Sequence, residues 1–282
     1  MPTINQEIRS ISTFRTPHIG YAGWLFVLLV HADYALASDA AIDASDPTRI
    51  YTFLGAGPKY SRYTNNEYMV EVRTTGNWGI DDNDMLLFEF GYGWHDGNLT
   101  PGSDTGITNP RIRYFHLLSM DYELDHGYRG MGLQADLQFA GELKGTDGQN
   151  VMTAGIMPTF AFDPEWNLYL MLGAVGSWDK SFAKFNGAGV NLSPKFVYSP
   201  ETLWEGAQFQ LTPTVKYFVS GTLENKVSGN LEFNIGGEFT PTLMWDIVGD
   251  INLDVDLKSF RGESDAELEN DWSIFFNVTS FF

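Results

Sequence analysis

Charged side chains recur at two-residue spacing along much of this sequence. Arg111 and Arg113 are separated by one residue, and so are Asp254 and Asp256. In a β-strand, residues two apart lie on the same face. Rows of carboxylates and guanidinium groups on one face can line a wet interior, orient dipolar solutes and repel ions of the wrong sign. The spacing therefore points to selection of solutes by charge, provided that these runs are strands.

Groups for covalent or metal chemistry are scarce by comparison. The chain has no cysteine and shows no compact motif of serine and histidine, which a nucleophile triad would need. The histidines beyond residue 37 are His95, His116 and His126. Asp84 or Asp96 near His95 keeps Asp/His hydrolysis open as the least favoured alternative. The acidic run 263–270 lacks the ligand spacing of an EF-hand. We therefore expect no enzyme activity, no metal site and no cofactor.

Net charge and hydropathy exclude two further classes of protein. The formal charge of −19 argues against a nucleic-acid partner, because phosphate binding needs clustered lysine and arginine. Mean hydropathy is −0.18, and no run of about twenty apolar residues exists that would form a membrane-spanning helix. A barrel wall keeps mean hydropathy low, since only every second strand residue meets lipid.

The first 37 residues have the organisation of a secretory signal peptide. Arg9 and Arg15 precede the apolar run 21–30, and Ala35-Leu36-Ala37 supplies a small-x-small cleavage site. Residues 38–48 then form a short leader rich in Ser, Asp and Ala, which we expect on the periplasmic side. We expect the remaining segment, 49–282, to form one folded unit.

Beyond Thr48, apolar and polar residues alternate with a period of two up to the last residue. Leu243–Lys258 shows this most clearly, with Leu, Trp, Ile and Val on one parity and five acidic or amide residues on the other. The expected strands are 50–61, 67–76, 84–95, 109–122, 128–141, 150–162, 166–178, 188–198, 206–219, 229–239, 243–257 and 271–282. Fourteen strands, by division of some of these runs, is the alternative.

The connections favour a transmembrane barrel over a soluble sandwich. Odd-numbered connections such as 96–108 and 259–270 are polar and long, whereas even-numbered ones such as 80–83 and 240–242 are short turns. Outer-membrane barrels show this asymmetry, with long outer loops and short periplasmic turns. The sequence therefore predicts an all-β, antiparallel, up-and-down transmembrane barrel of about twelve strands, with both termini on the periplasmic side.

Aromatic residues near strand ends match the two interfacial girdles of such a barrel. Trp166 and Trp178 begin and end one run with the same parity. Twelve residues at about 3.3 Å each, tilted by roughly 40°, rise about 30 Å along the membrane normal. The predicted girdle residues are Trp94, Trp166, Trp178, Trp245 and Trp272.

Five prolines interrupt the runs, and we interpret them as bulges or rims, because proline cannot donate to a ladder. They are Pro58, Pro110, Pro158, Pro194 and Pro213.

Strand parity also predicts which side chains face the interior. A barrel of about twelve strands leaves a narrow lumen, and its acids outnumber its bases, so we expect water inside and a preference for cations. A structural or adhesive barrel with a plugged lumen is the alternative. The predicted pore-lining residues are Glu71, Arg73, Glu89, Arg111, Arg113, Asp136, Lys195, Lys216, Glu232, Glu238, Asp246, Asp250, Asp254 and Asp256.

The last strand resembles the terminal signature of outer-membrane proteins. Phe282 ends the chain, and Val278, Phe276, Ile274 and Trp272 alternate behind it, although Ser280 departs from the usual pattern. The resemblance implies recognition by the barrel-assembly machinery, with Phe282 as the assembly signal, and location in the outer membrane among lipid and lipopolysaccharide.

In architecture, residues 38–282 resemble the small porins of the OmpG and KdgM kind from Gram-negative bacteria. This resemblance implies a monomer and passive diffusion of small hydrophilic solutes. The arginine-rich lumen of channels for acidic sugars is missing from this sequence.

Overall fold

The computed structural model describes residues 50–63, 66–97, 104–124, 127–144, 148–163, 165–200, 207–221, 232–248, 251–263 and 270–282. Within these ranges, the side chains of 122–124, 127–128, 163, 214–221, 232–248, 251–263 and 270–271 are outside the description. The expected signal peptide and leader, 1–48, also lie outside it. Among the described residues, no helix is long and apolar enough to cross a membrane.

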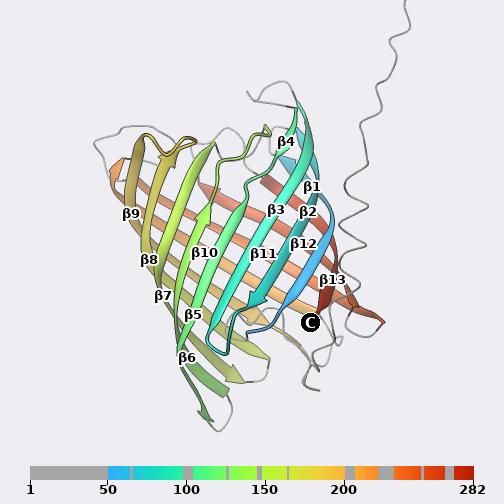
Figure 1. Cartoon of the computed structure of the whole chain (residues 1–282), viewed down its shortest axis with the longest axis vertical. Coiled ribbons are helices and arrows are strands. Elements are labelled where there is room, and N and C mark those ends of the chain that lie inside the picture. The colour runs from blue at the N-terminus through green and yellow to red at the C-terminus, as the bar shows by residue number, and fades with distance from the viewer. Residues whose placement is uncertain are drawn as a thin grey trace, which may run out of the picture. The chain divides into compact units, whose positions relative to one another are not determined.

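Thirteen antiparallel strands account for nearly all of the described chain (Figure 1). They are β1 (Phe53–Tyr63), β2 (Tyr68–Gly79), β3 (Asp84–Asp96), β4 (Thr105–Ile107), β5 (Arg111–Leu124), β6 (Gly127–Gln138), β7 (Gln149–Asp163), β8 (Trp166–Asp179), β9 (Phe185–Tyr198), β10 (Ala207–Gly221), β11 (Glu232–Val248), β12 (Ile251–Glu263) and β13 (Asn270–Phe281). Their order follows the chain, as expected for an up-and-down barrel.

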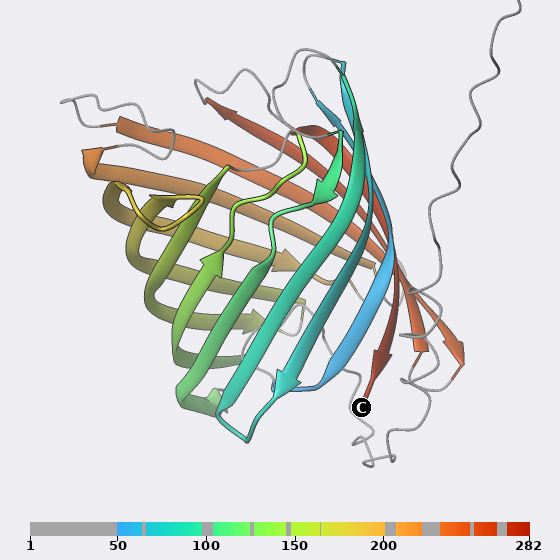
Figure 2. The ribbon, with the colours of Figure 1, turned by 45° about the horizontal axis from the view of Figure 1, so that its top comes forward.

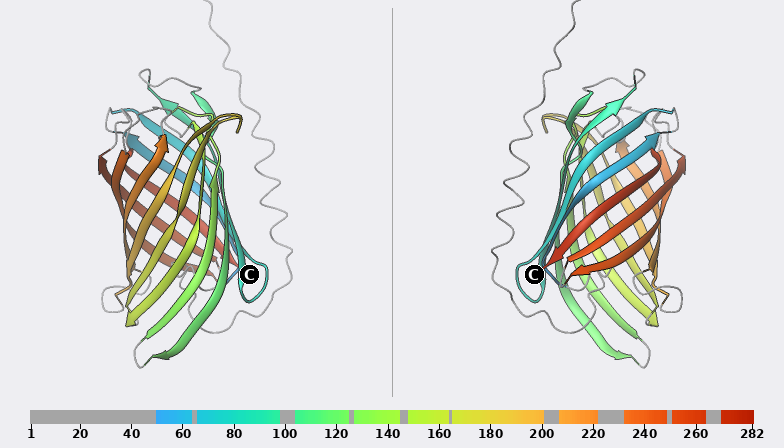
Figure 3. Two further views of the ribbon diagram at one scale, coloured as in Figure 1. Left: turned by 90° about the vertical axis from the view of Figure 1, so that its left-hand side faces the viewer. Right: turned by 90° about the vertical axis from the view of Figure 1, so that its right-hand side faces the viewer.

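The paired strands close into a ring. β1 pairs with β13 on one side and with β2 on the other, and β2 continues to β3. β4 and β5 both lie beside β3, so the thirteen described strands occupy twelve positions around the wall, which confirms the predicted number. Figure 3 shows the blue and red ends of the chain side by side in this wall. Closure removes the exposed edge that an open sheet would present.

The two faces of the wall have reversed polarity compared with a soluble protein. On β13, the side chains of Trp272, Phe276 and Val278 are exposed, whereas Ser273 and Asn277 between them are buried. A similar alternation holds along β8 and other strands whose side chains are described, where the exposed face carries Val, Leu, Ile, Phe and Trp. A face of this kind is stable against lipid acyl chains, not against water.

Most of the shortest turns lie at one end of the strands and most of the longer connections at the other, with the four-residue β1–β2 and eight-residue β9–β10 connections as exceptions. The connection from β2 to β3 is Ile80–Asn83, at the end of the barrel where the carboxyl terminus also lies (Figures 1 and 2). We name this the turn end, and the opposite one, which carries the connections β3–β4 and β6–β7, the loop end.

One predicted turn is wrong. The sequence places a turn at 240–242, but β11 runs without interruption from Glu232 to Val248, and the chain reverses between Val248 and Ile251. The expected strand 243–257 is therefore divided between β11 and β12. Because Trp245 pairs with Leu253 and Leu243 with Val255, residues of equal parity still lie opposite one another.

The prolines lie beside gaps in a ladder, but the predicted bulges are not found at Pro58, Pro158 or Pro213, because the register is the same on both sides of each. Pro58 pairs with Val72 of β2, and its pair with β13 is missing between Ala56 and Lys59. Pro110 lies in the break between β4 and β5, and the pairing of β7 with β8 has a gap between Ile156 and Thr159, around Pro158. Similarly, the pairing of β9 with β10 is interrupted between Leu211 and Val215, around Pro213. Proline is tolerated at these points because one of the two neighbouring ladders needs no donor there.

Candidate functional site

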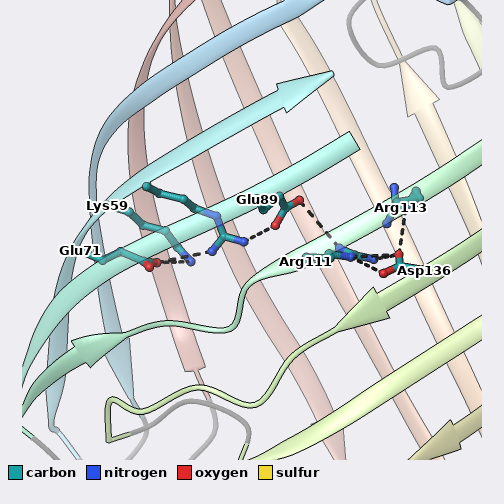
Figure 4. Close-up of polar contacts among 7 residues, drawn as sticks. Lys59, Glu71, Glu89, Arg111, Arg113 and Asp136 are labelled. Carbon is teal, nitrogen blue, oxygen red and sulfur yellow. Dashed lines mark hydrogen bonds and ion pairs between the residues drawn. The ribbon is translucent and has the colours of Figure 1, made fainter. Parts of the chain in front are cut away.

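Seven charged side chains form a chain of alternating sign on the buried, inner face of β1, β2, β3, β5 and β6 (Figure 4). We name this set the charged ladder. In order around the wall it consists of Lys59, Glu71, Arg73, Glu89, Arg111, Asp136 and Arg113. It crosses five strands, so residues distant in sequence meet only because the sheet brings them together.

The first half of the charged ladder is centred on Glu71. Its Oε1 lies 3.1 Å from Lys59 Nζ and 3.5 Å from Arg73 Nη1, and the side chain has no exposed surface. Lys59 and Glu71 are direct cross-strand partners of β1 and β2. Arg73 then donates a hydrogen bond to Glu89 on β3. A buried carboxylate requires such partners, because the desolvation of an isolated charge is very unfavourable.

The second half is centred on Asp136 of β6. Arg111 Nε lies 2.8 Å from Asp136 Oδ1 and 2.9 Å from Oδ2, and Arg113 Nε donates to Oδ2 at 2.8 Å. Arg111 also lies 3.9 Å from Glu89 Oε1, which joins the two halves. One carboxylate thus holds two guanidinium groups at fixed positions on the wall, through charge-assisted hydrogen bonds.

Glycines allow parts of the charged ladder to lie flat against the wall. A Cβ placed on Gly91 would lie 2.5 Å from Glu71 Oε2, and one on Gly93 would lie 2.9 Å from Glu71 Cβ. The Glu71 side chain therefore extends over the backbone of β3 instead of projecting from the wall. Phe115 covers Gly132 on β6 in the same manner. Small residues beside large ones thus reduce how far the inner side chains project.

The closed, alternating wall has counterparts among known proteins. The COG4313 outer membrane channel from Pseudomonas putida F1 is similar over 86% of this chain and 100% of that chain, with a TM-score of 0.53 and 11% sequence identity. The KdgM porin is similar over 81% of this chain and 99% of that chain, with a TM-score of 0.44 and 10% identity. Neither a protein-family model nor a curated protein sequence matches this chain. The fold is that of outer-membrane channels.

At the level of architecture, the likeness to the COG4313 channel confirms the expected antiparallel β-barrel fold. At 11% identity the likeness concerns the fold alone, so the solute and the ion preference have to be argued from the residues of this chain.

Six of the residues predicted to line the pore meet in the charged ladder: Glu71, Arg73, Glu89, Arg111, Arg113 and Asp136. Lys195 lies apart on β9, with Nζ 6.0 Å from the centre of the Tyr169 ring. Strands β10, β11 and β12 contain further predicted residues whose side chains are outside the description: Lys216, Glu232, Glu238, Asp246, Asp254 and Asp256. Asp250 lies wholly outside it.

Aromatic side chains gather near both ends of the outer face. Toward the loop end, Trp94 packs on Tyr68 with ring centres 5.5 Å apart, and Trp272 packs on Tyr60 at 5.3 Å. Trp178 and Phe185 lie 5.6 Å apart at the same end. Toward the turn end, Trp166 stacks on Tyr198 at 4.3 Å, and Phe209 continues the row at 6.3 Å. The predicted girdle residue Trp245 lies on β11, where side chains are outside the description. The predicted assembly signal, Phe282, is exposed beside β1, and its amide donates a hydrogen bond to the Thr52 carbonyl.

Among the described residues, His95 and His116 contact different carboxylates from those considered in the sequence analysis. Asp84 contacts His116, not His95, with 2.8 Å between His116 Nδ1 and Asp84 Oδ1, and Tyr114 donates to the same carboxylate. This trio lies on the exposed apolar face, beside Ile112. His95 is buried, with Nε2 3.6 Å from Glu67 Oε2 and its ring 5.4 Å from that of Tyr63. Within the described ranges, no group of three His, Cys, Asp or Glu side chains is placed to hold a metal ion.

Proposed function

We propose that this protein is an outer-membrane channel through which small hydrophilic solutes diffuse passively, with a preference for cations. The observation that carries the proposal is the polarity of a closed wall: apolar side chains outside, and amides, hydroxyl groups and the charged ladder inside, beside a smaller cluster of apolar side chains. A wall with this polarity separates a polar interior from lipid. The counterpart with a similar fold is itself an outer membrane channel.

Charge compensation supports the preference for cations. The charged ladder contains four bases and three acids, and each base lies beside a carboxylate, so its positive charge is largely offset locally. By contrast, the acids predicted for the interior outside the charged ladder all lie on β11, β12 and the turn between them. Of the predicted bases, only Lys216 lies nearby, on the neighbouring β10. An excess of carboxylates around a narrow path attracts cations and repels anions.

Reversal potentials in planar bilayers test this proposal. With a gradient of KCl across the membrane, the expected potential has the sign of a cation-selective pore. Replacement of Asp254 and Asp256 by Asn should reduce the preference, whereas Asp121→Asn, at an exposed pair with Arg129, should leave it unchanged. An anion-selective potential would refute the preference, and absence of conductance in the wild-type protein would refute the channel.

A structural barrel with a filled lumen is the second candidate. The observation in its favour is a cluster of buried apolar side chains, Met85, Phe115 and Met157, on the inner face. The two candidates differ in conductance, which a filled barrel lacks.

Assembly by the barrel-assembly machinery, contact with lipopolysaccharide and a monomeric state complete the proposal. Mass photometry in detergent tests the last of these.

A further inference from the structure

The inner face carries an apolar layer next to the charged ladder, on the side of the turn end. Five side chains form what we name the apolar collar: Phe53 of β1, Met85 of β3, Phe115 of β5, Met157 of β7 and Phe281 of β13. Their parity is that of the charged ladder, because Phe53, Met85 and Phe115 share strands with Lys59, Glu89 and Arg113 and are separated from them by even numbers of residues. The apolar collar therefore belongs to the interior and not to the lipid-facing surface.

The apolar collar is packed. Phe115, Met85 and Met157 are almost fully buried against one another, with Ile50 and Leu117 beside them. Phe53 and Phe281 lie 5.8 Å apart, with Tyr51 within 5.9 Å of both rings. Between these groups, the amide nitrogen of Asn77 lies 2.6 Å from the Met85 sulfur. Thioethers and rings thus cover the inner wall where a hydrophilic channel would be expected to keep polar groups.

Such a layer discriminates between solutes by their hydration. A hydrated alkali ion loses water contacts in an apolar constriction and gains none in return, which is how hydrophobic constrictions exclude ions. A cation with apolar surface meets thioethers and ring faces instead. Methionine side chains adapt to irregular apolar shapes, and aromatic faces attract organic cations.

We propose that this channel, if the function proposed above holds, selects small organic cations of the alkylammonium class over alkali ions, and that the apolar collar determines this selectivity. A solute that enters from the loop end meets the charged ladder first, and one that enters from the turn end meets the apolar collar first. In both directions the apolar collar contacts the alkyl groups of the solute. Met85 and Met157 are unbranched and can change conformation beside Phe115, which lies over Gly132.

Bi-ionic reversal potentials with tetramethylammonium on one side and K⁺ on the other test the inference. For the wild-type protein, the permeability ratio of tetramethylammonium to K⁺ should exceed the ratio of their free-solution mobilities by about threefold. A factor of this size corresponds to the free energy of burying roughly one methyl group. The double variant Met85→Ala/Met157→Ala should return the ratio to that of the mobilities. Met152→Ala, on the exposed face of β7, is the matched control and should behave as the wild type.

Each outcome separates the inference from the proposed function. A conducting wild-type protein whose ratio equals that of the mobilities would overturn the inference and leave the channel intact. A raised ratio that the double variant keeps would remove the apolar collar as its cause. Absence of any conductance would overturn the channel itself, and the inference with it. If the double variant does not fold, Met157→Gln keeps the length of the side chain, and the wild-type ratio alone still decides the first point.

Discussion

The Glu71 carboxylate lies directly over the backbone of Gly91, and a Cβ at Gly91 would be 2.5 Å from Glu71 Oε2. A residue of β2 thus uses the missing side chain of its β3 neighbour to stay against the wall. The same position lies close to the Thr108 hydroxyl, so Glu71 has little room to move aside. Glu71 and Gly91 therefore form a pair in which the smaller residue sets the conformation of the larger.

Gly91→Ala should displace Glu71 and disturb its contacts with Lys59 and Arg73. Overpacking of this kind costs about 1–3 kcal/mol of folding stability, and the displaced side chain should narrow the lumen. We expect a lower single-channel conductance and a lower temperature of barrel unfolding. The unfolding temperature is measured from the heat-dependent migration of the barrel in gels. Gly148→Ala is the control, since a Cβ there meets nothing within 4 Å. Equal conductance in the two variants would show that Glu71 does not lie along the path.

Asp136→Asn removes the carboxylate that holds Arg111 and Arg113. The charged ladder would then keep four bases and two acids, so the cation preference of the channel should decrease. The weakening of the charge-assisted hydrogen bonds from two guanidinium groups, both partly exposed, should cost about 1–2 kcal/mol. Salt-gradient reversal potentials and thermal unfolding measure the two effects. Asp121→Asn makes the same change of charge at an exposed pair, and an equal shift in both variants would contradict a local role of Asp136.

Deletion of Phe282 should impair assembly in cells more than folding in detergent. Phe282 is exposed and contributes a backbone hydrogen bond to Thr52, so the folded wall depends little on its side chain. Its resemblance to the terminal signature of outer-membrane proteins predicts a role in recognition instead. The amount of folded barrel in outer-membrane fractions measures this effect, with refolding from urea as the reference. Phe162→Ala, at another exposed phenylalanine, is the control; equal yields from the two variants would refute the role.

The strands and their inner and outer faces could be predicted from alternation, because lipid and a polar interior impose opposite demands on successive residues. The error at 240–242 arose from Thr240-Pro241-Thr242, which looks like a turn but lies inside β11. Parity survived this error, since the true reversal between Val248 and Ile251 pairs residues of equal parity. The short β4 was missed, because three residues, 105–107, carry too little pattern to be recognised.

The contacts of the charged ladder could not be predicted, because they depend on register. Lys59 meets Glu71 and Arg113 meets Asp136 as direct cross-strand partners, but Arg111, whose partner in the register is Gln138, reaches diagonally to Asp136. The apolar collar was missed for a related reason. Met85, Phe115 and Met157 have the parity of the interior, but in sequence each looks like an ordinary apolar strand residue.

The central claim is that successive residues of one strand face lipid and an enclosed polar interior. Spin labels at Val190→Cys and Asn191→Cys on β9 test it most directly, since no native cysteine interferes and the two positions are exposed and buried, respectively. In reconstituted bilayers, the label at position 190 should collide with oxygen dissolved in lipid, and the label at position 191 should be shielded from it. Equal oxygen accessibility at both positions would contradict the account.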